Sequence, residues 1–418
     1  MNKRTKHKLR TAFWKHTSVT TALCMFLSSF LVSFSSSQED GFSAVEMESS
    51  PLLSPHEVLK ANPVRVGYWQ KFNPSWEQFS LLELERRFQG NATHHKDNWS
   101  LAFTDLDKLM EDPSNRLESE FKIPAGLRGR VGFWLQVFGR YSSDIKIVHD
   151  KRNPEIIFGT ISGANSYGAE RTERFVLKAL KDRIKEAAGL SETQLLSDLE
   201  RQSLRSLLEL AGGLDEKNVR RILRDLRTQT GQRDHFLAGI QRSQILMPQI
   251  EAIFAERGLP LGLTRIPFVE SSFNPNAFSR IGAIGLWQFV RETAKQMIHR
   301  DSVELWRDPI AQSKAAAKLL QLYRNVLPNW GLAVTAYNSG VGRIRRLSQK
   351  YEVETVEDFQ NIPIKEDLGF AGRNFFAEVL AVNLLEQYKD IIFEHELSPF
   401  ESHIVFKSPG IKERKQRF

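Results

Sequence analysis

Residues 258–289 have the sequence GLPLGLTRIPFVESSFNPNAFSRIGAIGLWQF, the most informative part of the chain. Within it, Glu270 follows the apolar residues Ile266 to Val269, and this pattern predicts a short apolar helix with a carboxyl group at its end. Apolar surroundings disfavour the charged form of a carboxyl group and raise its pKa. Glu270 is therefore a candidate general acid near neutral pH, and the alternative is an exposed Glu at a helix end.

A loop with two glycines, Gly282 and Gly285, leads into the residues LWQF at 286–289. Glycine allows the backbone to approach a ligand closely. Trp287 and Gln288 together suit a sugar, because the ring can stack on it and the amide can bond its hydroxyl or N-acetyl groups. The alternative is a turn that carries a Trp of the hydrophobic core.

A third segment, WGLAVTAYNSGVG at 330–342, predicts a buried helix of small residues that ends near Asn338 and Gly340. Asn and Gly at this position are typical of a helix C-cap. The hydroxyl group of Tyr337 could serve as a cap, as a core contact or as a partner of a carboxyl group.

These segments, in this order and spacing, resemble the soluble lytic transglycosylase domain. The resemblance is carried by Glu270-Ser271, by GLWQ at 285–288 and by AYNSG at 336–340. The Trp in GLWQ and the preceding residues 253–260 resemble the membrane-bound lytic murein transglycosylase D branch. The resemblance covers about residues 230–392 and implies a lysozyme-like, mainly α-helical fold.

The resemblance also implies a reaction and a set of site residues. Glu270 would protonate the glycosidic oxygen between N-acetylmuramic acid and N-acetylglucosamine, and would then accept the proton of the muramic C6 hydroxyl as a 1,6-anhydro ring forms. Ser271 would hold Glu270 or a substrate N-acetyl group, while Gln288, Tyr337 and Asn338 would line a groove for peptidoglycan glycan strands. A single carboxyl group departs from the usual glycosidase pair. We expect neither a metal ion nor a cofactor.

One position departs from the family pattern, in the segment NFFAEVLA at 374–381. Phe375 stands where the family usually has Tyr, so the ring packing is kept and a hydroxyl group is lost. Two alternatives to the transglycosylase remain open. One is a hydrolytic muramidase on the same fold, and the other is a non-catalytic peptidoglycan-binding or scaffold protein, which Phe375 favours.

The charge of the chain is concentrated at its ends. The net charge is +8, but residues 1–37 contain six Lys or Arg and no Asp or Glu. The other 52 basic and 50 acidic residues leave +2, and a further basic cluster lies at 407–417. The body of the chain is thus nearly neutral, and we expect no nucleic acid as a partner.

The N-terminus is typical of an export signal. Its cations are followed by the apolar run 21–34, by Ser35 to Ser37 and then by polar residues. The run is shorter than the roughly 20 residues of a spanning helix. We expect an exported protein that is located in the periplasm or cell envelope and can associate with the membrane. The alternative is that the apolar run forms a buried helix at the terminus. Cys24 lies too early in the run for a lipid anchor.

The sequence predicts five parts: a signal peptide at 1–37, a linker at 38–63, a mostly helical region at 64–228, the lysozyme-like domain at 230–395 and a basic tail at 396–418. Strands at 145–150 and 155–161 are predicted to form a β-hairpin, and 170–228 to be helical, with one helix starting near residue 191.

Asp308-Pro309 is typical of a helix N-cap rather than of a catalytic group. The adjacent His94 and His95 diverge, so a metal site there is not expected. Nothing indicates an oligomeric state.

Overall fold

The computed structural model describes residues 108–298, 306–362, 368–393 and 397. Within these ranges the chain is mainly helical with one small antiparallel sheet, which confirms the predicted fold class. The predicted signal peptide, the linker, Cys24, the two adjacent histidines and nearly all of the basic tail lie outside the described residues.

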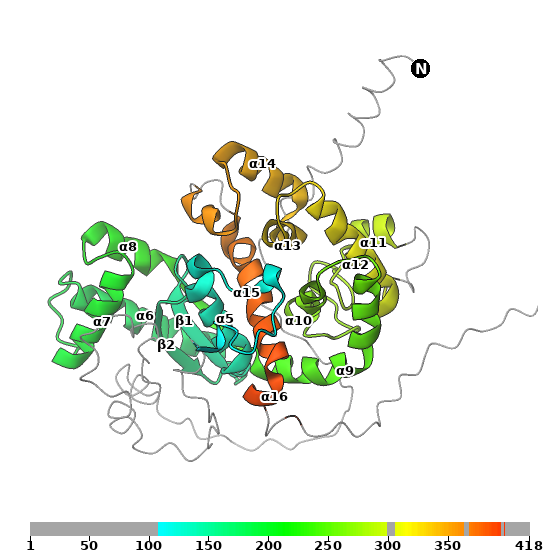
Figure 1. Ribbon diagram of the computed structural model, residues 1–418. Coiled ribbons are helices and arrows are strands. Elements are labelled where there is room, and N and C mark those ends of the chain that lie inside the picture. Colours follow the sequence, from blue (N-terminus) through cyan, green and yellow to red (C-terminus); the bar gives the residue numbers. More distant parts are fainter. Residues whose placement is uncertain (1–107, 299–305, 363–367, 394–396, 398–418) are drawn as a thin grey trace, which may run out of the picture.

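Helix α15 (Gly369–Gln387) lies in the middle of the described structure (Figure 1). Apolar residues occur all around this helix, as is typical of a helix that is buried on every side. One side of α15 packs against α5 (Arg128–Gly139), and the other packs against α10 (Ile266–Ser271) and α13 (Trp330–Ser339). The short helix that carries Glu270 therefore rests directly on the central helix.

The other helices surround this centre. They are η5 (Ser119–Phe121), η6 (Ala125–Leu127), α9 (Arg233–Ala255), η7 (Leu261–Arg265), α11 (Arg291–Met297), α12 (Pro309–Arg324), α14 (Val341–Tyr351), η8 (Glu357–Asn361) and α16 (Lys389–Ile392). Helix α9 is 23 residues long. Asp308 caps α12 by accepting a hydrogen bond of 2.6 Å from the Ala311 backbone N–H, and Pro309 follows at the first helical position. The structural role predicted for Asp308 is confirmed.

One large hydrophobic core joins these helices. It contains Val131, Phe133 and Leu135 from α5 together with residues from Phe236 to Phe393. Residues on both sides of position 229 thus share one core, because α5 covers a side of α15 that would otherwise face water.

The sheet has the strand order β2-β1-β3, with both pairs antiparallel. Strands β1 (Ile145–Asp150) and β2 (Ile157–Ser162) confirm the predicted hairpin. Strand β3 (Leu226–Thr230) corrects the prediction that the helical segment continues to residue 228. The free edge of β1 offers unpaired backbone groups to this short segment, and such pairing between distant residues leaves no mark in the local sequence pattern.

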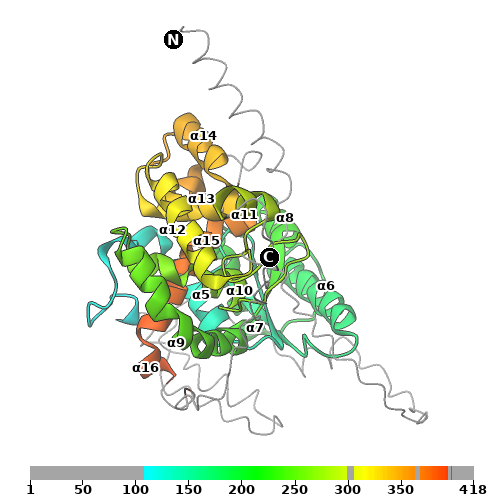
Figure 2. The ribbon, with the colours of Figure 1, turned by 90° about the vertical axis from the view of Figure 1, so that its right-hand side faces the viewer.

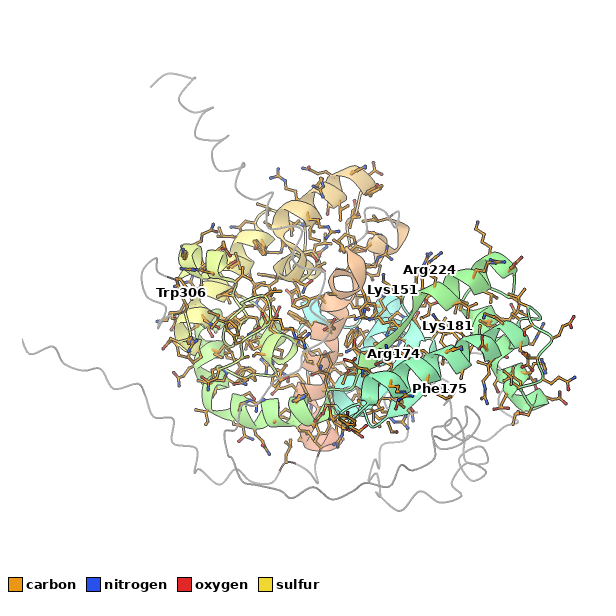
Figure 3. The ribbon with its side chains drawn as sticks, turned by 180° about the vertical axis from the view of Figure 1, so that it is seen from behind. Lys151, Arg174, Phe175, Lys181, Arg224 and Trp306 are labelled. Atoms are coloured by element: carbon orange, nitrogen blue, oxygen red, sulfur yellow. The ribbon has the colours of Figure 1, made fainter. Side chains whose placement is uncertain are left out.

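Three helices pack near the sheet and form a second, smaller core with residues such as Val148 and Phe158. They are α6 (Ala169–Ala187), α7 (Asp198–Leu210) and α8 (Glu216–Asp225). We call the sheet and these helices the sheet–α6–α8 unit. Figure 1 shows α6 and α8 on one side of α15 and α12 and α13 on the other, and Figure 2 shows α14 at the top of the described structure and α16 near its bottom. In Figure 3, Arg174 and Phe175 lie on the sheet–α6–α8 unit, and Trp306 lies at the opposite side of the described structure.

The predicted helix start near residue 191 is also corrected. Helix α7 begins seven residues later, after Ser197, whose side chain forms a capping box with Glu200. The reason is tertiary: the backbone N–H groups of Leu195 and Leu196 donate to the buried carboxylate of Glu186, at 2.7 and 3.2 Å. Because these two N–H groups donate to a side chain, they are not available for the backbone hydrogen bonds of a helix that starts near residue 191. Among the helices of the described ranges, we find none that is long and apolar enough to cross a membrane.

Candidate active site around Glu270

Glu270 lies at the penultimate position of α10, and only 8% of it is exposed. Pro267 is the second residue of this helix, where the missing N–H has no partner within the helix to lose, and the apolar residues around it pack into the core. Burial raises the pKa of Glu270 to about 8, and no hydrogen bond or charge among the described residues offsets that effect. The predicted rise in pKa is confirmed, so Glu270 is mostly protonated at neutral pH.

The turn after Glu270 has an unusual backbone. Ser272 and Phe273 both adopt left-handed conformations, with φ of 49° and 58°. Such conformations are unfavourable for residues other than glycine and persist only where the surroundings hold them. Here the guanidinium of Arg242 donates a hydrogen bond of 2.6 Å to the Ser272 carbonyl, and Phe273 is fully buried. The turn therefore fixes the direction in which α10 presents Glu270.

A buried ion-pair network holds the other end of α10. Arg265, the last residue of η7, donates to Glu386 of α15 from Nε and Nη2, at 3.0 and 2.9 Å, and to Glu251 of α9 from Nη1. Arg265 is 5% exposed and Glu386 4%. Burial alone would raise the pKa of Glu386, but Arg265 and Lys389 outweigh it and lower the pKa. The helix of Glu270 is thus anchored between α9 and α15.

The glycine loop packs onto α12 instead of facing solvent. Gly285 has a φ of 77°, and a Cβ atom there would overlap the Gln312 side chain. Trp287 is fully buried, and its indole Nε1 donates to Ser313 Oγ at 2.8 Å. Its ring stacks on Phe254 with centroids 5.6 Å apart. Trp287 is therefore a residue of the hydrophobic core, as the alternative interpretation stated. The prediction that its ring stacks on a sugar is wrong, because the ring is fully buried.

Ser271 and Gln288 hold backbone in place. Ser271 Oγ donates to the Leu286 carbonyl at 2.8 Å, which ties α10 to the glycine loop. Gln288 has a φ of 48° and is 8% exposed, and its Nε2 donates to the Gly285 carbonyl at 2.9 Å. Gln288 Oε1 is buried without a hydrogen-bond partner in the described part of the chain. Both side chains stabilise the loop next to Glu270.

Tyr337 lies beside Glu270 at the last turn of α13. Its hydroxyl donates to the Trp287 carbonyl at 2.7 Å, and its ring stacks on Phe375 with centroids 6.4 Å apart and planes at 8°. Burial raises the pKa of Tyr337 well above its usual value, and the charge of Glu270 raises it further. Phe375 keeps the ring packing, as predicted. Asn338 follows Tyr337 and is half-buried.

Two groups near the site were missed by the sequence interpretation. Gln312 of α12 is fully buried, accepts a hydrogen bond of 2.9 Å from the Trp287 backbone N–H and donates to the carbonyls of Ile284 and Trp306. Nothing in its local sequence marks this role. Glu378 of α15 has its pKa raised to about 8 by burial and by Glu270, against the effect of Arg227. The only sign of Glu378 in the sequence was a carboxyl group between the apolar residues Ala377 and Val379.

The order of the motifs and the geometry around Glu270 agree with the match of this segment to a known protein family. Residues 248–359 match the model of a family described as "Transglycosylase SLT domain". This part of the chain is therefore similar to an SLT domain. All five predicted site residues lie inside the matched range, from Glu270 to Asn338, whereas Phe375 and Glu378 lie beyond it.

Two curated proteins that are similar to the chain are also named as transglycosylases. The "Membrane-bound lytic murein transglycosylase D" proteins of Escherichia coli strain K12 and of Escherichia coli O6:H1 are each 29% identical to the chain over 130 residues. The alignments cover 30% of this chain and 29% of the length of each relative. The chain thus matches less than a third of the length of these relatives.

Proposed function

We propose that the protein is a peptidoglycan lytic transglycosylase in which Glu270 is both the general acid and the general base. The observation that carries this proposal is the burial of Glu270 in the SLT domain, with a pKa of about 8 and no partner among the described residues to stabilise its charge. A protonated carboxyl group in such surroundings can donate its proton at neutral pH.

The reaction uses the carboxyl group of Glu270 twice, first to donate a proton and then to accept another. Glu270 donates it to the glycosidic oxygen that leaves C1 of N-acetylmuramic acid, and the carboxylate then accepts the proton of the C6 hydroxyl of the same sugar. The C1–O4 bond breaks and a C1–O6 bond forms, so the product has a 1,6-anhydro end and Glu270 returns to its starting form. No water is consumed, so a second carboxylate to activate water is not required.

The other predicted site residues have supporting roles in this proposal. Ser271 and Gln288 hold the glycine loop against α10, and Tyr337 closes one side of the site with its ring on Phe375. Asn338 is the half-buried polar group at the end of α13 and supplies an amide to the glycan. Substrate contacts by these residues stay a prediction.

The cellular place of the protein is a further part of the proposal. We propose export to the periplasm or cell envelope, supported by the cations and the apolar run of residues 1–37 and by the words "membrane-bound" in the names of the relatives. We also propose that residues 64–228 position the catalytic domain in the envelope or bind partners. The packing of α5 on α15 links this region to the site.

The test is mass spectrometry of the products released from purified sacculi. Wild-type protein is expected to release muropeptides with 1,6-anhydro ends. Glu270→Gln keeps the size of the side chain but has no proton to donate, so turnover is expected to fall by about 10²–10⁴-fold. Glu256→Gln, at an exposed residue after α9, is the matched control and should leave turnover unchanged.

Two outcomes would contradict the proposal. Intact reducing ends without anhydro sugar would show a hydrolytic muramidase on the same fold. Equal clearing of sacculi by Glu270→Gln and by wild type would remove Glu270 from the reaction.

A further inference from the structure

Helix α6 carries a row of cations along the face opposite its buried residues. The members recur at intervals of three and four residues, so they lie side by side on the helix surface. We call them the basic row of α6, and they are Arg171, Arg174, Lys178 and Lys181. The buried face, with Val176, Leu180 and Ile184, packs into the second core and thereby fixes the direction in which the row points.

The basic row has no acidic partner within the described part of the chain. Its first three cations are exposed and Lys181 is half-buried. Glu170, in the first turn, is the one exposed acid of α6. The other acids of the helix have partners outside the row: Glu173 pairs with Lys146, Asp182 with Lys185 and Glu186 with Arg201.

The stability of α6 does not account for this arrangement. Like charges that lie three or four residues apart on a helix repel each other. Arg171 is also in the first turn, at the positive end of the helix dipole, where a cation is unfavourable. A row in which every neighbour is a like charge therefore indicates an anionic partner.

A hydrogen-bonded loop presents an aromatic ring at the start of the row. Tyr167, shortly before the first residue of α6, is fully exposed. The loop is held by Asp144, which accepts from the backbone N–H groups of Gly163 and Asn165 at 3.2 and 3.3 Å. Ser166 Oγ donates to the Gly163 carbonyl at 2.6 Å. The exposure of this ring thus belongs to a folded loop, and a tyrosine suits the boundary between water and the apolar part of a bilayer.

A second aromatic ring adjoins the row on α6 itself. Phe175 is half-buried and is not among the residues that pack into either hydrophobic core. Figure 3 shows Arg174, Phe175 and Lys181 along α6. The surface therefore combines cations with apolar rings, as helices that lie on a bilayer surface do.

The shape of this surface fits a planar anionic partner. An α-helix rises 1.5 Å per residue, so the row spans about 15 Å along a convex ridge. Cations in a line do not converge on one point, as they would to bind a single phosphate or carboxylate group. Long Lys and Arg side chains can instead reach many headgroups while their apolar stems lie at the boundary of the bilayer.

The row lies apart from the candidate active site. Figure 1 shows α6 on one side of α15 and α12 and α13 on the other. The glycine loop beside Glu270 packs on α12, where Gln312 accepts from the Trp287 backbone N–H. A partner on the row and a glycan at Glu270 therefore do not compete for the same surface.

We infer that the basic row of α6, with Tyr167 at its start, binds the anionic phospholipid headgroups of a bilayer surface. This contact holds the catalytic domain beside the membrane and gives residues 64–228 a specific role in the envelope. The inference goes beyond the proposed reaction and rests only on the proposed location of the protein.

The first test is co-sedimentation of the full chain with vesicles that contain phosphatidylglycerol and phosphatidylcholine in equal parts. Wild type should bind them more tightly than vesicles of phosphatidylcholine alone, and less tightly as added salt screens the headgroup charges. The row variant should bind the anionic vesicles at least about tenfold more weakly, and Gln is a good helix former that keeps α6 folded. It combines Arg171→Gln, Arg174→Gln, Lys178→Gln and Lys181→Gln.

A second variant controls for net charge. It removes four exposed cations of α11 and α12, by Arg291→Gln, Lys295→Gln, Lys314→Gln and Lys318→Gln. Its net charge equals that of the row variant but the row is intact, so binding to anionic vesicles should stay within about twofold of wild type. Equal binding by the two variants overturns the inference, because charge elsewhere in the chain then accounts for the attraction.

Purified sacculi separate the bilayer from the polymers of the wall. With Glu270→Gln as the common background, the row variant should sediment with sacculi as well as the protein with an intact row. A row variant that loses sacculi but keeps anionic vesicles overturns the inference, since the partner is then an acidic polymer of the wall.

The second test reports on the position of the contact. An environment-sensitive fluorophore is attached at Tyr167→Cys or, as the control, at Leu322→Cys on α12, both with Cys24→Ser to remove the only native cysteine. Both positions are exposed. Anionic vesicles should shift the emission of the label at 167 to the blue and leave the label at 322 unchanged. No shift at 167, or equal shifts at both positions, overturns the inference.

These measurements do not depend on the reaction. If the row binds anionic vesicles but sacculi yield no anhydro ends, the proposed function fails and the inference stands. If anhydro ends form but vesicle binding does not depend on the row, the inference fails and the proposed function stands.

Discussion

Buried carboxyl groups have opposite surroundings in the two regions of this protein. In the sheet–α6–α8 unit, Asp150 bonds Arg221 at 2.5 Å, and Glu186 accepts from two backbone N–H groups and from Arg201. Burial opposes ionisation of Glu186, but these donors outweigh it and lower its pKa. Around Glu270, burial acts with no such compensation and the pKa rises to about 8.

The difference separates carboxyl groups that stabilise the fold from one that the fold leaves reactive. A buried charge with several donors fixes nearby backbone, as Glu186 does before α7. A buried carboxyl group without donors keeps its proton and adds little to stability. The Glu270 region contains both kinds, because Glu386 is paired with Arg265 while Glu270 is not.

The largest expected effect on the free energy of unfolding comes from the buried ion pair of Arg265 with Glu386. Arg265→Met should lower the free energy of unfolding by about 3 kcal/mol, because Glu386 keeps Lys389 but loses its buried partner. Urea unfolding at pH 7, followed by circular dichroism, measures it. Lys389→Met, which removes the half-exposed partner, is the control with a smaller loss. A loss below about 1 kcal/mol for Arg265→Met would contradict the structural role of the network.

Glu186→Gln tests the same idea in the other region. The amide cannot serve two backbone donors and Arg201 as the carboxylate does, so the free energy of unfolding should fall by about 2 kcal/mol at pH 7. Turnover per folded molecule should stay at the wild-type level. The matched variant is Glu270→Gln, which should do the reverse: no loss of stability and a large loss of turnover.

The two carboxyl groups should also give stability opposite dependences on pH. The pKa of Glu270 is raised in the folded state, so the protonated folded form loses stability as pH rises from about 4.5 toward 8, by about 1.4 kcal/mol per pH unit. For Glu186 the pKa is lowered, so its contribution is present above pH 4.5 and is lost as pH falls. Unfolding of wild type and of both Gln variants from about pH 2 to about pH 9 measures the two slopes. Equal slopes in wild type and Glu270→Gln would refute the raised pKa.

The smallest effect concerns the wall of the site. Tyr337→Phe keeps the ring on Phe375 but removes the bond to the Trp287 carbonyl, so the free energy of unfolding should fall by about 1 kcal/mol. Thermal unfolding by calorimetry detects this. Tyr351→Phe, on α14 away from Glu270, is the control for loss of a hydroxyl group. A loss of several kcal/mol would mean that the hydroxyl does more than hold the glycine loop.

Much of the site could be predicted because its signals are local. The apolar residues before Glu270 predicted both a short helix and a raised pKa, and Asp308-Pro309 predicted a helix start. Trp287 could not be placed from its neighbours, because a ring that stacks on Phe254 and one that faces a sugar have the same sequence context. Glu378 was missed for a similar reason, since its relation to Glu270 spans more than 100 positions.

The sequence by itself determined the helical class, the hairpin, the helix of Glu270 and the order of motifs that predicts the SLT domain, because periodicity, caps and turns depend on neighbouring residues. Only the tertiary structure decided that β3 completes the sheet, that Leu195 and Leu196 stay outside a helix, and that Glu270 acts electrostatically on Glu378. Each of these depends on hydrogen bonds or charges between residues far apart in the chain. Glu270 belongs to both groups: its helix follows from the local pattern, and its unpaired state from packing.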